Sequence, residues 1–125
     1  MHLEMSQLPA SQLDLETRKA LGRTSPQLAW TQIQTQVANA IQHDRAKAEK
    51  ELQEAEYPAS LDNLHSNLAA VTPERGISLF HESNPDLSLS QLPKMEPLKV
   101  LKAVLNSLMN NEKWDLPKSR KRKAV

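Results

Sequence analysis

The sequence predicts an all-α protein, either a helical hairpin or a small irregular helical bundle. Four of the 125 residues are aromatic, so a core has to be built from Leu, Ile, Val and Ala, which suit helix-on-helix packing. The eight prolines stand mostly where helices can begin or must end, and apolar residues between them recur at helical spacing. A chain of this length is enough for one hydrophobic core. We therefore expect residues 1–116 to form a single helical domain.

The first helix is expected over residues 12–21. Ser11 is a suitable N-cap, and Gly22 can take the left-handed conformation that often follows a helix. Few apolar residues share one face of this segment, so we expect this helix to dock on the others rather than organise the core.

The longest helix is expected over residues 26–56, at the centre of the predicted fold. Ser25 and Pro26 provide an N-cap and the favoured first-turn proline. Residues 43–56 are rich in Ala, Lys, Glu and Gln, with opposite charges four residues apart, which is typical of a solvated helix. We therefore expect half of this helix to be buried and half to be exposed. Its apolar face consists of Trp30, Ile33, Val37 and Ile41.

A long coiled coil is the alternative arrangement for the same helix. Its seam would need large apolar residues at positions 40, 44 and 47, where the sequence has Ala40, Asp44 and Lys47. The pattern therefore favours packing within a bundle over a long coiled coil.

A short helix is expected over residues 61–71, with Ser60 as its N-cap. Thr72 and Pro73 can begin one or two further turns, but Gly76 and the prolines that follow argue against a long helix. The apolar residues of the short helix repeat at spacings of 3, 4 and 3, as Leu61, Leu64, Leu68 and Val71.

Residues 83–96 are predicted to form a loop or an extended, Pro/Ser-rich strap. Leu87, Leu89 and Leu92 alternate with serines in this segment, so a short strand against the edge of a partner is an alternative.

The strongest amphipathic helix is expected over residues 97–111, after Glu96 and with Pro97 in its first turn. Lysines and asparagines line its polar side, and Pro117 prevents any continuation. We expect residues 117–125 to form a basic tail that is disordered when free. The broad apolar face consists of Leu98, Leu101, Val104, Leu105, Leu108 and Met109.

Charge is divided unevenly along the chain. Residues 1–96 hold 8 Lys/Arg and 13 Asp/Glu, whereas residues 97–125 hold 8 and 2. An acidic body with a basic end can bind an acidic surface through that end alone, while the body binds something else.

The sequence contains no recognisable pattern for catalysis, for a cofactor or for a metal. The absence of cysteine excludes disulfides, thiolate metal sites and cysteine nucleophiles. The four histidines lie far apart, and none has a second His or a carboxylate at i+4. With two glycines the chain has neither a phosphate-cradling loop nor a glycine-supported oxyanion loop. We therefore predict a protein that is not an enzyme.

Neither a membrane span nor a signal peptide is predicted. No apolar run approaches the ~18 residues that a bilayer-spanning helix needs, and the first residues lack the basic-then-apolar order of a signal peptide. We expect no membrane partner and a reducing compartment.

A basic cluster behind Pro117 has a definite mechanistic interpretation. It resembles a monopartite nuclear localisation signal, in which an extended basic peptide binds the acidic, aromatic-lined grooves of an import receptor through residues 117–123. This predicts a nuclear location, with the cytoplasm as the alternative. The same charges also suit a phosphate-binding arm or a solubilising tail. The cluster consists of Lys118, Arg120, Lys121, Arg122 and Lys123.

Three residues are candidates for phosphorylation. Residues 72–75 resemble the Ser/Thr-Pro-x-Lys/Arg acceptor of cyclin-dependent kinases at Thr72, and Ser25 has the minimal Ser-Pro form. Both residues also suit a helix N-cap before a first-turn proline. A phosphate on Ser119 would subtract charge from the basic cluster and weaken its binding.

Together these patterns predict a non-enzymatic helical interaction or scaffold subunit of a larger nuclear assembly. Its apolar helix faces would bind other protein subunits, and the basic cluster would direct import. The alternative is a nucleic-acid-binding accessory factor that uses the basic tail. The pattern leaves open whether the apolar residues bury against each other or against a partner. The predicted partner-binding residues are Trp30, Ile33, Val37, Ile41, Leu98, Leu101, Leu105 and Leu108.

Overall fold

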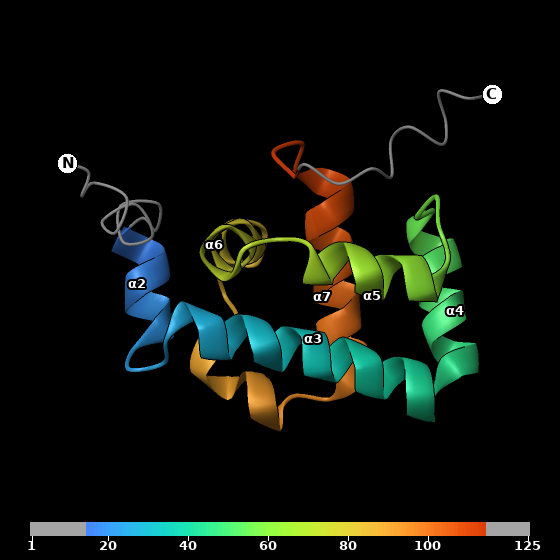
Figure 1. Ribbon diagram of the computed structural model, residues 1–125, viewed down its shortest axis with the longest axis horizontal. Helices are drawn as coiled ribbons and strands as arrows, with labels where there is room; N and C mark the ends of the chain where they lie inside the picture. Colours follow the sequence, from blue (N-terminus) through green and yellow to red (C-terminus); the bar gives the residue numbers. More distant parts are fainter. Residues whose placement is uncertain (1–14, 115–125) are drawn as a thin grey trace.

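The computed structural model describes residues 15–114, which form an all-α fold as the sequence predicts. These residues contain no strand, and their helices pack as a small irregular bundle (Figure 1). The elements in chain order are α2 (Leu15–Leu21), α3 (Pro26–His43), α4 (Arg45–Ala55), α5 (Leu61–Ala69), α6 (Pro73–Ser83), the 3-10 helix η1 (Leu89–Lys94) and α7 (Pro97–Asn110).

The helices α3 and α7 form the centre of the bundle. α3 lies across the molecule, α7 crosses it, and α6 and α4 flank α7 on either side (Figure 1). Both helices bury side chains at the spacing of one helix face, so the core is the contact between these two faces and their neighbours. The apolar side chains that α3 and α7 bury are Ala29, Trp30, Ile33, Val37, Ala40, Ile41, Val100, Leu101, Val104, Leu105 and Leu108.

The structure corrects the single long helix expected over residues 26–56, because the chain bends at Asp44. Asp44 has φ −137° and ψ 50°, outside the helical region, although its amide still donates to the carbonyl of Ala40. A straight helix of that length would extend about 46 Å, far beyond a domain of this size. The bend instead folds α4 back beside α7, where Leu52 is buried (Figure 1). The same bend excludes a continuous coiled-coil helix over residues 26–56.

Serine N-caps and first-turn prolines mark the beginnings of the main helices. Oγ of Ser25 accepts a hydrogen bond from the Leu28 amide at 3.1 Å, and Oγ of Ser60 accepts one from the Asn63 amide at 3.0 Å. Pro97 is the first residue of α7. These local interactions satisfy backbone donors that have no partner inside the helix.

The helix α6 is longer than the one or two turns expected after Thr72, and it continues to Ser83. The reason is that Gly76 acts as a packing residue rather than a helix breaker. The indole of Trp30 lies directly against it, and a Cβ atom at this position would lie 2.6 Å from ring carbons. The missing side chain makes room for Trp30.

The strap expected over residues 83–96 contains the 3-10 helix η1, so the alternating leucines do not form a short strand. Gln36 ties η1 to α3, because its Nε2 donates to the carbonyl oxygens of Leu92 and Met95, both at 2.8 Å. Leu89 and Leu92 are buried. This segment is therefore part of the core.

The remaining boundaries lie close to those expected. α5 ends at Ala69 and α7 ends at Asn110, within two residues of the predicted ends at 71 and 111. Residues 12–14 of the first predicted helix lie outside the described residues, as do residues 117–125, which were expected to form a disordered tail.

Candidate partner-binding surface

The eight residues predicted to bind partners lie mainly in the core of the chain itself. Ile33, Val37 and Leu101 have no exposed surface, and Leu98 is partly buried. These side chains pack against one another and therefore offer little surface to a partner. Partner contact through them stays a prediction. The full set is Trp30, Ile33, Val37, Ile41, Leu98, Leu101, Leu105 and Leu108.

Two of the three predicted phosphorylation sites lie in the described chain. Ser25 and Thr72 are exposed N-caps of α3 and α6, and Thr72 makes no side-chain cap hydrogen bond. The two helix beginnings are neighbours, because Nε2 of Gln27 donates to Oε2 of Glu74 at 3.0 Å. Ser119 lies outside the described residues, and so does the basic cluster at 118–123.

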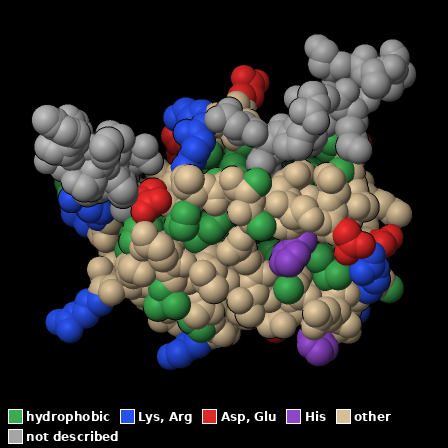
Figure 2. Space-filling model, in the orientation of Figure 1, with side chains coloured by type: hydrophobic (Ala, Val, Ile, Leu, Met, Phe, Trp, Pro, Cys, Tyr) green, Lys and Arg blue, Asp and Glu red, His purple; other side chains and the backbone are tan. Residues whose placement is uncertain are grey.

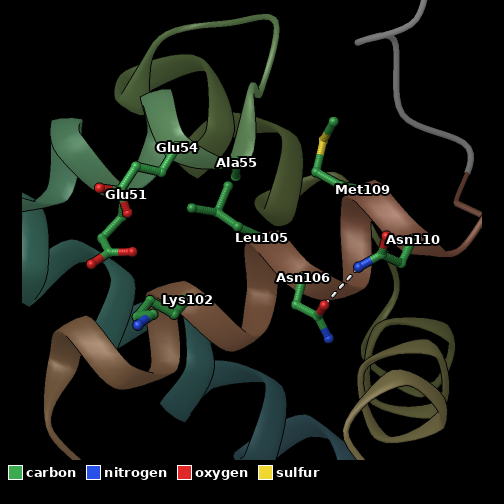
Figure 3. Close-up of a pocket in the computed structure, with 8 residues that line it drawn as sticks. All are labelled: Glu51, Glu54, Ala55, Lys102, Leu105, Asn106, Met109 and Asn110. Atoms are coloured by element: carbon green, nitrogen blue, oxygen red, sulfur yellow. Dashed lines mark hydrogen bonds between the residues drawn. The ribbon is translucent and has the colours of Figure 1, made fainter.

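A surface hollow of about 340 Å³ lies between α4 and α7. Its floor is apolar, α4 contributes two carboxylates to one wall, and α7 contributes a lysine and two side-chain amides (Figure 3). The lining residues are Glu51, Glu54, Ala55, Lys102, Leu105, Asn106, Met109 and Asn110.

Helical spacing explains this mixed chemistry. Lys102, Asn106 and Asn110 follow one another at four-residue intervals and share the exposed side of α7. Glu51 and Glu54 share a side of α4 at a three-residue interval. Among residues 15–114, no ion pair neutralises either of these carboxylates. The α4 wall is therefore negatively charged.

A second hollow, of about 650 Å³, lies between α6 and the C-terminal end of α7. It shares Asn106 and Asn110 with the first hollow, and Nδ2 of Asn110 donates to Oδ1 of Asn106 at 2.6 Å. These two side chains form a ridge between the hollows. We call the ridge and both hollows the α7 surface. The second hollow is lined by Glu82, Ser83, Asn106, Asn110, Asn111, Glu112 and Lys113.

The loop of residues 111–114 is attached to α6. The Glu82 carboxylate accepts hydrogen bonds from Nδ2 of Asn111 at 2.9 Å and from Nζ of Lys113 at 2.8 Å. The Arg75 guanidinium donates to the carbonyl oxygen of Lys113. Because the Glu82–Lys113 ion pair is largely exposed, it contributes little by itself.

Buried contacts of Trp114 fix the end of this loop. Its indole N–H donates to Oγ of Ser107 at 3.1 Å, and that hydroxyl donates to the carbonyl of Leu79 at 3.2 Å. The Trp114 ring also stacks on Trp30, with 6.2 Å between ring centroids and 26° between planes. The chain therefore leaves the described fold at a defined point beside the second hollow.

Figure 2 shows one face of the molecule, on which the described residues can be compared by type. Its apolar side chains lie in small separate groups, and its charged side chains lie mainly towards the edges. Among residues 15–114, the large apolar side chains that are strongly exposed are Leu15 and Leu28. Scattered exposed leucines are usual for a soluble surface, so they do not indicate a binding site.

Burial affects the titration of Tyr57. It raises the pKa of the Tyr57 hydroxyl above its ordinary value of 10.0, and a hydrogen bond from Nδ2 of Asn67, at 2.9 Å, opposes this shift. Tyr57 is buried in the turn between α4 and α5, where this hydrogen bond connects it to α5.

The α7 surface was not among the sites predicted from the sequence. In the sequence, Glu51 and Glu54 belong to a segment typical of a solvated helix, and Lys102 and Asn106 to the polar side of another helix. The signal that could have indicated this surface is the pair of side-chain amides four residues apart on one helix. The α4 wall of the first hollow depends on the bend at Asp44, which has no strong local signature in the sequence.

Three further observations concern metal binding, membrane crossing and similarity to known proteins. Within residues 15–114, no three His, Cys, Asp or Glu side chains lie close enough together to hold a metal ion. Over the same range, no helix combines the length and the apolar character needed to cross a membrane. Comparison with known protein families, curated proteins and solved structures finds no match to this chain.

Proposed function

We propose that this chain is a non-enzymatic helical interaction subunit, a scaffold component of a larger nuclear assembly, and that a partner binds its α7 surface. The observation that carries the proposal is the pair of hollows that share Asn106 and Asn110. They lie on a helix whose opposite side is fixed in the core. A site on such a helix is held in position before the partner arrives.

The chemistry of the α7 surface suits a peptide or helix with an apolar side chain next to basic ones. Ala55 and Met109, which are both partly buried, provide an apolar floor within a polar rim, which is the usual arrangement at an interface. Glu51 and Glu54 favour Lys or Arg beside that apolar residue. Oδ1 of Asn106 accepts from Nδ2 of Asn110, and its second lone pair can accept a hydrogen bond from a partner backbone N–H.

Photo-crosslinking in cells tests this site. One chain carries p-benzoylphenylalanine in place of Met109, and a control chain carries it in place of Gln91, which is exposed on η1 outside the α7 surface. We expect the Met109 probe to give a discrete crosslinked protein that the Gln91 probe does not give. The variant E51Q/E54Q should lower that yield severalfold. The same products at both positions, or a yield unchanged by E51Q/E54Q, would overturn the proposed site.

The nuclear part of the proposal depends on the basic cluster, which places five positive charges in the six residues 118–123. The test is a reporter fusion too large for passive entry into the nucleus of a eukaryotic cell. We expect substitution of the five basic residues by Gln to abolish nuclear accumulation. A substituted chain that accumulates normally would contradict the import role.

A nucleic-acid-binding accessory factor is the second candidate, and the charge distribution favours placing its contacts in the basic cluster. Residues 15–114 hold 11 Lys/Arg and 12 Asp/Glu, so they have no excess positive charge for phosphate. If five phosphates are contacted, the logarithm of the affinity for duplex DNA should fall with the logarithm of salt at a slope of about −4.5. The five-Gln chain should lose this binding. Binding that persists unchanged in that chain would exclude this candidate.

A further inference from the structure

We propose that the chain's own basic segment, residues 117–123, docks on the α7 surface and competes there with a partner. The attachment point of the segment, its reach and its charge support this docking. Its regulatory meaning rests on the function proposed above.

The attachment point of this segment lies beside the α7 surface. The 111–114 loop lines the second hollow, and Trp114 is fixed by its buried contacts with Ser107 and Trp30. Lys118 follows Trp114 by four residues and Lys123 follows it by nine. An extended chain therefore carries these two residues at most about 14 Å and about 32 Å from the anchor.

This reach is sufficient to cross the α7 surface. From Asn110 back to Lys102 the helix rises about 12 Å, and neighbouring helix axes lie about 8–10 Å apart. The segment can therefore pass from the second hollow over the Asn106–Asn110 ridge to the wall that carries Glu51 and Glu54.

Charge complementarity favours the same occupant. The α7 surface is lined by four carboxylates and two lysines, whereas the segment carries five positive charges and no negative one. The methylene stems of Lys and Arg can lie along the apolar floor while their charged ends meet the carboxylates. The side-chain oxygens of the ridge can accept hydrogen bonds from the backbone N–H groups of the segment.

Because the segment is covalently attached to the chain, a weak intrinsic affinity for the α7 surface is sufficient for docking. A short tether gives an effective concentration in the mM range, so an intrinsic dissociation constant of about 1 mM gives about half occupancy. A partner that displaces the segment would then expose it to an import receptor. By reciprocity, a receptor that holds the segment would free the α7 surface for the partner.

A spin label tests the docking in the full chain. Because the chain has no cysteine, S119C provides a single attachment site for a nitroxide. The label should broaden the amide signals of Glu54 and Met109, with a loss of at least about half of their intensity at half occupancy. The signal of Gln91 should be unaffected. At about 0.5 M salt, where the screening length is only about 4 Å, the broadening should fall to the level that the tether alone imposes.

Matched variants separate docking from the proximity that any tether imposes. In the S119C background, replacement of the five basic residues by Gln and the variant E51Q/E54Q should each reduce the broadening to the level that the tether alone imposes. The variant E16Q/E96Q removes the same charge from exposed sites elsewhere and should leave the broadening in place. Equal broadening in the five-Gln chain, or equal loss in both Glu variants, would overturn specific docking.

A mixing experiment distinguishes one chain from two. Spin-labelled chain is mixed with isotope-labelled chain that carries no nitroxide. Broadening in this mixture would place the segment on a second copy and overturn docking within one chain. None of these measurements needs a partner or an import receptor, so their failure leaves the crosslinking result at Met109 standing, and a failed crosslinking test leaves the docking result standing.

Discussion

The helices α3 and α4 come from one continuous run of helix-favouring sequence, yet the fold uses them differently. α3 buries a full apolar face against α5, α6, α7 and η1, whereas α4 buries Ala48 and Leu52 and leaves its charged side chains in solvent. Helix propensity therefore explains why both segments are helical but not what each one does. The comparison predicts that changes in α3 alter stability and that changes in α4 alter recognition.

Truncation of one buried aliphatic side chain in each helix is the largest test of this comparison. Ile33 is fully buried, whereas Leu52 is 8% exposed. We expect Ile33→Ala to lower the free energy of unfolding by about 4 kcal/mol and Leu52→Ala by about 2 kcal/mol, because the site at Ile33 is enclosed and cannot collapse. Urea unfolding followed by far-ultraviolet circular dichroism measures both values. Equal losses would show that Leu52 of α4 contributes as much to the stability of the core as Ile33 of α3, which would contradict the comparison.

Two glutamines of α3 sharpen the comparison within one helix. Gln36 is buried and donates to two carbonyls of the η1 segment, whereas Gln42 is exposed. Gln36→Leu should cost about 2 kcal/mol because it leaves buried acceptors without a donor. Gln42→Leu should change stability by less than about 0.5 kcal/mol. Denaturation midpoints give the difference, and two equally stable variants would show that Gln36 does not hold η1.

The N-caps of the two helices should differ by a smaller amount. Ser25 accepts a hydrogen bond from an α3 amide, but the Asp44 side chain makes no cap hydrogen bond to α4. We expect Ser25→Ala to cost about 1 kcal/mol and Asp44→Ala less than about 0.5 kcal/mol. Thermal unfolding of the two variants checks the order. The opposite order would mean that Asp44 caps α4 in solution.

The smallest expected effect is a pH dependence just after α4. Burial raises the folded-state pKa of Tyr57 above 10.0, so the folded state holds this proton more tightly than the unfolded state does. The resulting stability is fully present below pH 10 and is lost as the pH rises through the raised folded-state pKa. Between about pH 9 and pH 11 the native chain should therefore lose more stability than Tyr57→Phe. Equal losses in urea unfolding would contradict this.

Local signals in the sequence were sufficient for the capped helix beginnings and for the ends of α5 and α7, but not for the bend after α3 or for the length of α6. The Ser25–Pro26 step marks the start of α3 because both residues act within one turn. The bend at Asp44 and the continuation of α6 through Gly76 depend on contacts with other helices. In the sequence alone, a glycine that makes room for the indole of another helix cannot be distinguished from a glycine that ends a helix.

The candidate site was harder to predict than the fold, because the same apolar face can serve a core or an interface. Ile33 and Leu101 matched both uses in the sequence, and burial against α6 and η1 could be known only once those elements were placed. The α7 surface combines Glu51 with Asn106, from segments that no local pattern connects. Such a site follows from the topology.

The stack of Trp30 on Trp114 has an optical consequence. These are the two tryptophans of the chain, and they are separated by 84 positions. Their contact closes nearly the whole described chain into one loop, and closing such a long loop has a high cost in conformational entropy. Indole emission and near-ultraviolet ellipticity should therefore report the closure of this chain loop rather than helix formation. In a refolding experiment, the amide signal should rise first and the indole signal should follow, so the unlabelled protein records the order of its own assembly.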